Sequence, residues 1–95
     1  MKGFGNMFRL WAKEFKNGKF LKDVTISDMA ENKSRTKKIF DAVDEICYEF
    51  DLSRPVWFDK NINEFKRRDK TRFNQDNFID SVDFDYLEIQ VIEED

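Results

Sequence analysis

The most regular hydrophobic pattern in the chain lies between residues 34 and 50. Its apolar residues recur with the spacing of one face of an α-helix: Ile39, Phe40, Val43, Ile46, Cys47 and Phe50. The positions between them are largely charged, as expected for a helix whose opposite face lies in water. We therefore predict one long amphipathic helix over 34–50, capped by Asn32 or Ser34, with its apolar face at the centre of the core.

Residues 7–27 are predicted to form a β-hairpin, because alternating apolar residues flank Asn17-Gly18, a strong turn sequence. A two-residue loop would place Phe15 opposite Phe20, but it would put the apolar residues of the two strands on opposite faces. A three-residue loop with Gly18 at positive φ puts them on one face, and we favour it. It predicts the pairs Phe8–Ile26 and Leu10–Val24.

The last regular stretch, 84–92, alternates apolar and polar residues as a half-buried strand does. Leu87, Ile89 and Val91 fall on one of its faces. We expect this strand to pair with the hairpin, because an isolated two-stranded ribbon is only marginally stable in water.

Shorter segments separate the main helix from this strand. A short helix is predicted over 60–68, with Asp59 as its N-cap and with Ile62 and Phe65 facing inward. The next two segments are predicted to be an ordered loop and then a turn or two of helix: 69–77 and 78–82.

Together these elements predict the α+β class and a single small globular domain over 1–95. The N-terminal β-hairpin and the C-terminal strand form a small antiparallel or mixed sheet, which packs on the long amphipathic helix. One or two short helices complete the fold. A chain of 95 residues is long enough for one modest core but not for a second.

Charge and hydropathy restrict the classes of function. The net charge is −3, which argues against a dedicated nucleic-acid binder on bulk charge alone. The apolar runs fall well short of the ~20 residues that span a membrane, so no membrane partner is expected. The N-terminus lacks the apolar run of a signal peptide, which favours a cytoplasmic protein.

Candidate catalytic chemistry is sparse. The chain has no histidine and one cysteine, which removes the commonest general base, zinc clusters and serine triads. Cys47 lies on the apolar helix face and is interpreted as a buried, inert thiol. A carboxylate site for a cation such as Mg²⁺ remains, built from Asp83 and Asp85 with Asp80 or Glu88. Because such acids more often cover a strand end, we assign no catalytic residue, metal ligand or cofactor.

Charge is also distributed unevenly along the chain. Residues 60–72 contain six Lys or Arg and two acids, whereas 76–95 contain eight acids and no base. In one interpretation the basic segment pairs internally with these acids: Asp76, Asp80, Asp83 or Glu93. In the other, which we favour, it is a binding surface whose arginines point into water near an exposed Trp57 ring: Arg67, Arg68 and Arg72.

Four runs of the sequence resemble a family of short proteins from clostridia and related Firmicutes. They are RLWAKEF, RTKKIFDAVDEICYEFDLSRPVW, KTRFNQDNFI and DFDYLEIQVIEED, and they cover most of the chain from Arg9 onward. The resemblance implies a bacterial, cytoplasmic setting. No activity is assigned to that family, so it implies no catalytic residues.

We therefore expect a non-catalytic module that binds another macromolecule, foremost a protein. Exposed Trp and Arg are enriched at the energetic centres of protein interfaces, which indicates these candidates: Trp11, Trp57, Arg67, Arg68 and Arg72. The alternative is a nucleic-acid-binding module that uses the basic segment 66–72, flanked by Phe65 and Phe73. A carboxylate-dependent metal enzyme is the third hypothesis.

Overall fold

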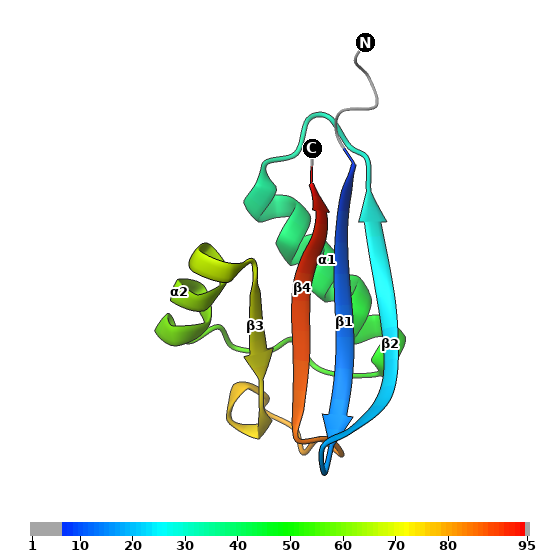
Figure 1. Cartoon of the computed structure of the whole chain (residues 1–95), viewed down its shortest axis with the longest axis vertical. Helices are drawn as coiled ribbons and strands as arrows, with labels where there is room; N and C mark the ends of the chain where they lie inside the picture. The colour runs from blue at the N-terminus through cyan, green and yellow to red at the C-terminus, as the bar shows by residue number, and fades with distance from the viewer. Residues whose placement is uncertain (1–6, 95) are drawn as a thin grey trace.

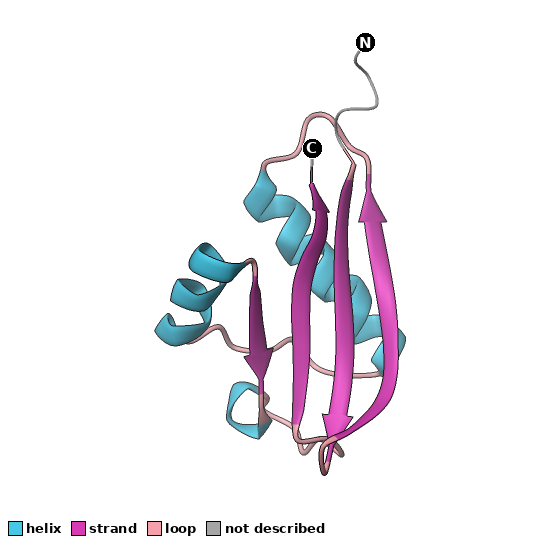
Figure 2. Ribbon diagram, viewed as in Figure 1, coloured by secondary structure: helices cyan, strands magenta, loops and turns pink. Residues whose placement is uncertain are grey.

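Four strands form one antiparallel sheet in the computed structural model, which describes residues 7–94 (Figures 1 and 2). The strands are β1 Phe8–Lys16, β2 Lys19–Asp28, β3 Lys70–Phe73 and β4 Tyr86–Glu94, in the order β2-β1-β4-β3 across the sheet. Two α-helices accompany them, α1 Arg35–Phe50 and α2 Asp59–Arg68. The predicted α+β class is confirmed. The expectation that the chain lacks a signal peptide concerns the N-terminus, where residues 1–6 lie outside the described part.

The sheet has one covered face and one open face. α1 runs behind the sheet in Figure 1, and α2 lies beside β3. The covered face carries the core residues of the strands: Phe8, Leu10, Ala12, Phe73, Leu87 and Ile89. The opposite face, turned toward the viewer, meets no helix of the described chain (Figures 1 and 2). Neither described helix is long and apolar enough to cross a membrane.

The hairpin differs from the predicted one at its turn. Asn17 and Gly18 form a two-residue turn with φ of 54° and 75°, and Phe15 pairs with Phe20. The three-residue loop is therefore wrong. A two-residue turn alone would put the apolar residues of the two strands on opposite faces. A β-bulge in β2, with Leu21 as the extra residue, brings them to the same face. Beyond the bulge the apolar residues share the covered face, as predicted, but with new partners: Leu10 opposite Ile26 and Ala12 opposite Val24.

The sheet also contains a strand in the segment that was predicted to be a loop. β3 pairs with β4, so that Thr71 lies opposite Ile89 and Phe73 opposite Leu87. Thr71 and Phe73 are buried, while the residues between and before them are exposed. The sheet is therefore wider than the hairpin and the C-terminal strand alone.

α1 begins at one of its two predicted caps, since the Ser34 hydroxyl accepts the Lys37 backbone N–H at 3.1 Å. Most of the predicted apolar face is buried: Ile39, Val43, Ile46 and Cys47. Phe50 is partly buried. Phe40 was predicted to be buried but is 48% exposed, because it turns toward Trp57 on the side of α1 that faces α2.

α2 departs from the prediction at its N-cap and on its inner face, and one further predicted helical turn is absent from the described structure. Phe58, not Asp59, occupies the N-cap position, and Asp59 lies in the first turn, where its charge suits the helix dipole. Phe65 is buried as predicted, but Ile62 is 39% exposed and Asn61 takes the inner position. The predicted helical turn over 78–82 is not formed; a 3₁₀ turn, Gln75–Asn77, precedes it.

Candidate functional site

Trp57 lies on the linker between α1 and α2. Its indole contacts three phenylalanine rings edge-on, at centroid distances of 5.7 Å to Phe40, 5.6 Å to Phe65 and 5.0 Å to Phe73. Edge-to-face contacts are the preferred arrangement of aromatic pairs. Trp57 is therefore held in one orientation and partly buried, rather than exposed as predicted.

A groove of about 240 Å³ runs beside Trp57 between the two helices. Its lining is largely apolar: Arg35, Thr36, Ile39, Phe40, Trp57, Ile62, Phe65 and Lys66. Phe40 comes from α1 and Ile62 from α2, and each keeps more than a third of its surface exposed. The groove therefore presents apolar side chains from both helices to solvent.

Two cations border the groove, and they differ in their partners. Arg35 is bound to Asp69 and Glu94, each at 2.8 Å. Lys66 forms no ion pair with any residue in the described part of the chain. The unmatched charge at the groove is therefore positive and belongs to α2.

The position of Trp57 depends on a buried amide that the sequence patterns did not reveal. Asn61 has no exposed surface, and its side-chain oxygen accepts the Phe58 backbone N–H at 3.0 Å. Its amide nitrogen donates to the Thr71 hydroxyl and to the Arg72 carbonyl, both at 2.9 Å. Asn61 thereby joins α2 to β3 and to the linker.

A second buried amide, Asn77, completes this connection. Its side-chain nitrogen donates to the Asn61 side-chain oxygen at 3.0 Å and to the Val56 carbonyl at 2.6 Å, and its backbone carbonyl accepts the Val56 N–H at 2.6 Å. Val56 directly precedes Trp57, so the two asparagines position the tryptophan against the helices. Isolated Asn residues in polar stretches carry no sequence signal for such a role.

The three arginines proposed for binding lie on two surfaces. Arg67 is on the outer side of α2 beside Lys60 and Lys66, whereas Arg68 and Arg72 border a hollow next to β3. Across residues 7–94, Arg67 and Arg68 form no ion pair. Arg72 is paired with Glu88 of the acidic segment 76–95, so the prediction that it points into water without a partner is wrong. In the described residues the basic segment forms no ion pair with the acids named for internal pairing: Asp76, Asp80, Asp83 and Glu93.

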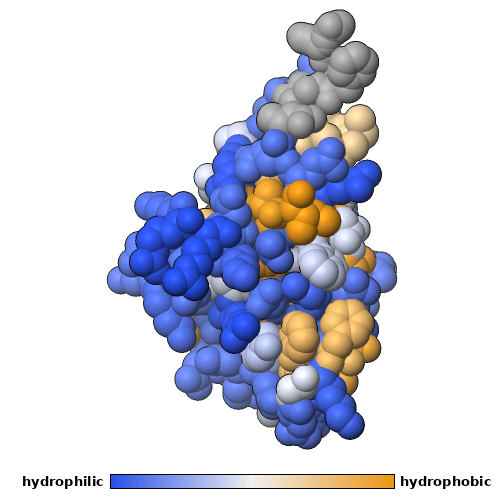
Figure 3. Space-filling view, in the orientation of Figure 1, coloured by the Kyte–Doolittle hydropathy of each residue, from blue (hydrophilic) through white to orange (hydrophobic). Residues whose placement is uncertain are grey.

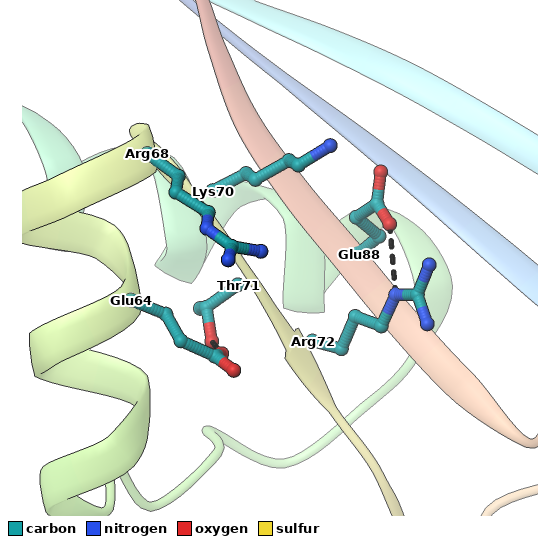
Figure 4. A pocket seen from close by; sticks show the side chains of 6 residues that line it. All are labelled: Glu64, Arg68, Lys70, Thr71, Arg72 and Glu88. Carbon is teal, nitrogen blue, oxygen red and sulfur yellow. Dashed lines mark hydrogen bonds and ion pairs between the residues drawn. The ribbon is translucent and has the colours of Figure 1, made fainter.

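The hollow beside β3 has a volume of about 250 Å³. It is lined by three cations and three other polar residues: Arg68, Lys70, Arg72, Glu64, Thr71 and Glu88 (Figure 4). In Figure 4, Arg68 and Lys70 extend from the α2 side toward β4, and Arg72 meets Glu88 on the other side. Glu64 is already engaged, since it accepts the Thr71 hydroxyl at 2.6 Å.

Glu88 is the best-partnered carboxylate of this region. Its two oxygens meet Arg72 Nε and Lys13 Nζ, each at 3.0 Å, and the residue is buried by these side chains. Burial would raise the pKa of Glu88, but the hydrogen bonds from Arg72 and Lys13 outweigh it and hold the pKa below its usual value. Glu88 is therefore a charged anchor for Arg72 rather than an acid–base catalyst.

Trp11 lies on the open face of the sheet, remote from the groove. Its indole N–H donates to the Asp23 carboxylate at 2.8 Å. The Lys13 ammonium lies 3.9 Å from the ring centroid. Trp11 and Trp57 therefore belong to opposite sides of the sheet and do not form one site.

The carboxylates considered as a cation site and the cysteine interpreted as inert can be placed in the described structure. No group of three or more His, Cys, Asp or Glu residues in this part of the chain is placed to hold a metal ion. Asp85 accepts the Asn17 backbone N–H at 2.7 Å and thereby braces the hairpin turn. Cys47 is buried, as predicted, and burial raises the pKa of its thiol to about 11.

The fold and its surfaces define an α+β protein with an apolar groove on the helical side and a basic hollow at the β3 edge. Comparison of the chain with family models, with curated proteins and with solved structures finds no match. The resemblance to the clostridial family stays a prediction.

Proposed function

We propose that the protein is a non-catalytic protein-binding module, and that its receptor surface is the groove between α1 and α2. The occupant is an apolar segment of a partner protein that carries acidic residues beside its apolar face. One observation supports this most strongly: Phe40 and Ile62 stay exposed on the two walls, over a Trp57 ring that three phenylalanines hold in place.

The size and lining of the groove favour a protein segment over a small molecule. Pockets for drug-sized ligands usually enclose about 300–1,000 Å³ and bury most of the ligand. The groove has about 240 Å³ and is open to solvent between two helices. It therefore suits a few anchoring side chains of a larger partner, as in the docking of an amphipathic helix into a groove.

Charge complementarity specifies the partner further. Lys66 lines the groove and forms no ion pair in the described structure, whereas Lys60 and Arg67 lie on the outer side of α2. Unmatched charge at the rim of an apolar interface speeds association with a partner of opposite sign and disfavours partners of the same sign. An acidic segment is therefore favoured over a basic one.

The cellular setting is part of the same proposal. The resemblance to the clostridial family supports a bacterial, cytoplasmic protein, and we place the partner in that compartment. Trp57 remains the principal binding residue of the original set. The groove lining excludes the other candidates, Trp11, Arg67, Arg68 and Arg72.

A fluorescence titration tests the groove directly. The variant Trp11→Phe leaves Trp57 as the sole indole, so its emission reports on the groove alone. The probe is a synthetic helical peptide with Leu on one face and Glu on the other. We expect a saturable change in Trp57 emission, and no change with a matched peptide that carries Lys in place of Glu.

Matched variants on α1 separate groove binding from general stickiness. Phe40→Ser should abolish the response, because it removes one wall of the groove. Tyr48→Ser should leave the response intact, because Tyr48 is 87% exposed and does not line the groove. Equal responses to the two peptides, or equal losses in the two variants, would contradict the proposal.

A further inference from the structure

The open face of the sheet is organised in rows that run across the strands. The first row is aromatic: Phe20, Phe15 and Tyr86. The second is charged: Asp23, Lys13, Glu88 and Arg72. The third contains Thr25, Trp11, Gln90 and Lys70. Figure 3 shows this face as mostly hydrophilic with separate hydrophobic patches. The strand register places aromatic and charged side chains next to one another on this face.

The aromatic row continues into the basic hollow. Phe15 stacks on Tyr86 with ring centroids 5.1 Å apart, and Phe20 meets Phe15 edge-on at 5.9 Å. The Arg72 guanidinium lies 4.4 Å from the centroid of the Tyr86 ring. A continuous platform therefore leads from Phe20 to Arg72, and both ends are accessible: Phe20 is 53% exposed and the Arg72 side chain 62%.

Positive charge remains unmatched at one end of this platform. Arg68 and Lys70 have no ion-pair partner among residues 7–94. Glu88 is neutralised by Lys13 and Arg72, whereas Glu64 accepts the Thr71 hydroxyl and keeps its negative charge. Three cations therefore line the hollow against two carboxylates, which leaves a net positive charge there. Only the Nε atom of Arg72 contacts Glu88, so its terminal nitrogens are left to meet a ligand.

We propose that this face binds single-stranded nucleic acid, with a backbone phosphate in the hollow of Arg68, Lys70 and Arg72 and with bases stacked on Arg72 and Phe20. The site is independent of the groove, because it uses the opposite side of the sheet and shares none of its lining residues. The protein would thus bind a partner protein and a nucleic-acid strand at the same time.

The chemistry of the platform favours a single strand over a duplex. A single strand offers unstacked bases to aromatic rings and to guanidinium planes, whereas a duplex keeps its bases paired and stacked. An exposed sheet face with aromatic side chains is suited to such bases. The hollow accommodates one phosphate group rather than the long tract of phosphates that a duplex presents.

Fluorescence anisotropy with labelled oligo(dT) and oligo(rU) strands tests the site. We expect saturable binding to at least one strand at low salt, weakening as salt rises with a slope near −0.7 per contacted phosphate. Arg68→Gln/Lys70→Gln should weaken binding about tenfold or more and make the salt slope shallower by about 0.7 for each phosphate contact removed. Phe20→Ser should weaken binding about fivefold or more and leave the salt slope unchanged.

The control variant removes the same charge from the helical side. Lys37→Gln/Arg54→Gln deletes two cations, each in an exposed ion pair of α1 or its linker, and should bind as the parent does. Far-ultraviolet circular dichroism confirms that every variant is folded. A paired duplex of equal length should bind more weakly than the strands.

Three results would overturn the proposal. The first is the absence of saturable binding to both strands at low salt. The second is an equal loss in the control variant, which would reflect net charge alone. The third is undiminished binding by Phe20→Ser together with equal binding of duplex, which would indicate a general polyanion site.

Discussion

The side-chain nitrogen of Asn77 donates to the side-chain oxygen of Asn61 across 3.0 Å, and neither residue has exposed surface. One comes from α2 and the other from the 3₁₀ turn before β4. Through Val56, Thr71 and the Arg72 carbonyl this amide pair joins the linker, α2 and β3. Both candidate surfaces depend on it, since the linker carries Trp57 and β3 carries Arg72.

The first prediction concerns this pair. Asn61→Ala leaves several buried donors and acceptors without partners and should lower the free energy of unfolding by about 3 kcal/mol. The matched control is Asn63→Ala, an exposed position on the same helix, which should change it by less than about 0.5 kcal/mol. Urea denaturation measures both, and equal effects would mean that the buried network contributes little.

The second prediction is a pH dependence. Because the pKa of Glu88 lies below its usual 4.5 in the folded protein, its charged form contributes stability that is present above pH 4.5 and is lost as the pH falls through the folded pKa. Glu88→Gln should therefore be less stable than the parent at neutral pH. The difference should shrink on acidification.

Thermal unfolding between pH 7 and pH 3 measures this effect. Glu49→Gln serves as the control, because Glu49 is exposed on α1 and forms no ion pair in the described residues. Its stability should run parallel to that of the parent over the whole range. If the stability difference between the parent and Glu88→Gln stayed constant over this pH range, the ionised form of Glu88 would contribute no stability, and the prediction would be wrong.

A third prediction separates two phenylalanines on Trp57. Phe73 is fully buried, so Phe73→Ala should cost about 3–5 kcal/mol. Phe40 is 48% exposed, so Phe40→Ala should cost only about 1 kcal/mol, mainly through its edge contact with the indole. A loss above about 3 kcal/mol for Phe40→Ala would mean that the groove is closed in solution.

The hairpin turn yields the fourth prediction. Gly18 has φ of 75°, and an added Cβ would meet no atom within 4 Å. Gly18→Ala should therefore cost about 1 kcal/mol through backbone strain alone. Lys16→Ala, in the adjacent strand position, is the control and should be nearly neutral. Identical melting curves for Gly18→Ala and the parent would argue against the two-residue turn.

The fifth prediction uses the single cysteine. Burial and a pKa of about 11 keep the Cys47 thiol protonated and shielded, so iodoacetamide at pH 8 should not label the native protein. Labelling should proceed quickly in urea. The variant Tyr48→Cys adds a thiol at a neighbouring exposed position, and it should take up one label without denaturant. Rapid labelling of Cys47 itself would show that α1 opens readily.

The sequence patterns predicted the elements in which the apolar repeat extends over many residues, and they missed the shortest strand. The helical period over 34–50 and the alternation over 84–92 correspond to α1 and β4. β3 is four residues long, so its alternation involves only Thr71 and Phe73 on the inner face, too few to distinguish a strand from a loop. The spacing of apolar residues identifies the apolar face of a helix, but it does not show how much of that face the neighbouring elements cover. Phe40 was therefore predicted to be buried although it lies at the uncovered margin of the face.

The candidate sites were predicted less well, for a related reason. Basic and aromatic residues lie near one another in the sequence, but the fold places neighbouring residues on different surfaces. Lys66 and Trp57 meet at the groove, while Arg68 and Arg72 meet at the hollow. Asn61 and Asn77 lie in polar stretches, and nothing in the pattern around them marks either residue as buried.

The bulge at Leu21 has a consequence for how copies of the protein behave at high concentration. β2 is an outer strand of ten residues, long enough to recruit a strand from a neighbouring molecule. Leu21 interrupts its ladder, and the strand curves strongly toward the hairpin end (Figure 1). The charged Lys19 and Lys22 side chains flank the interruption. A strand from another molecule could therefore pair with only a short regular stretch of the β2 edge. The bulge that brings the apolar residues to one face thus also disfavours fibre-like self-assembly.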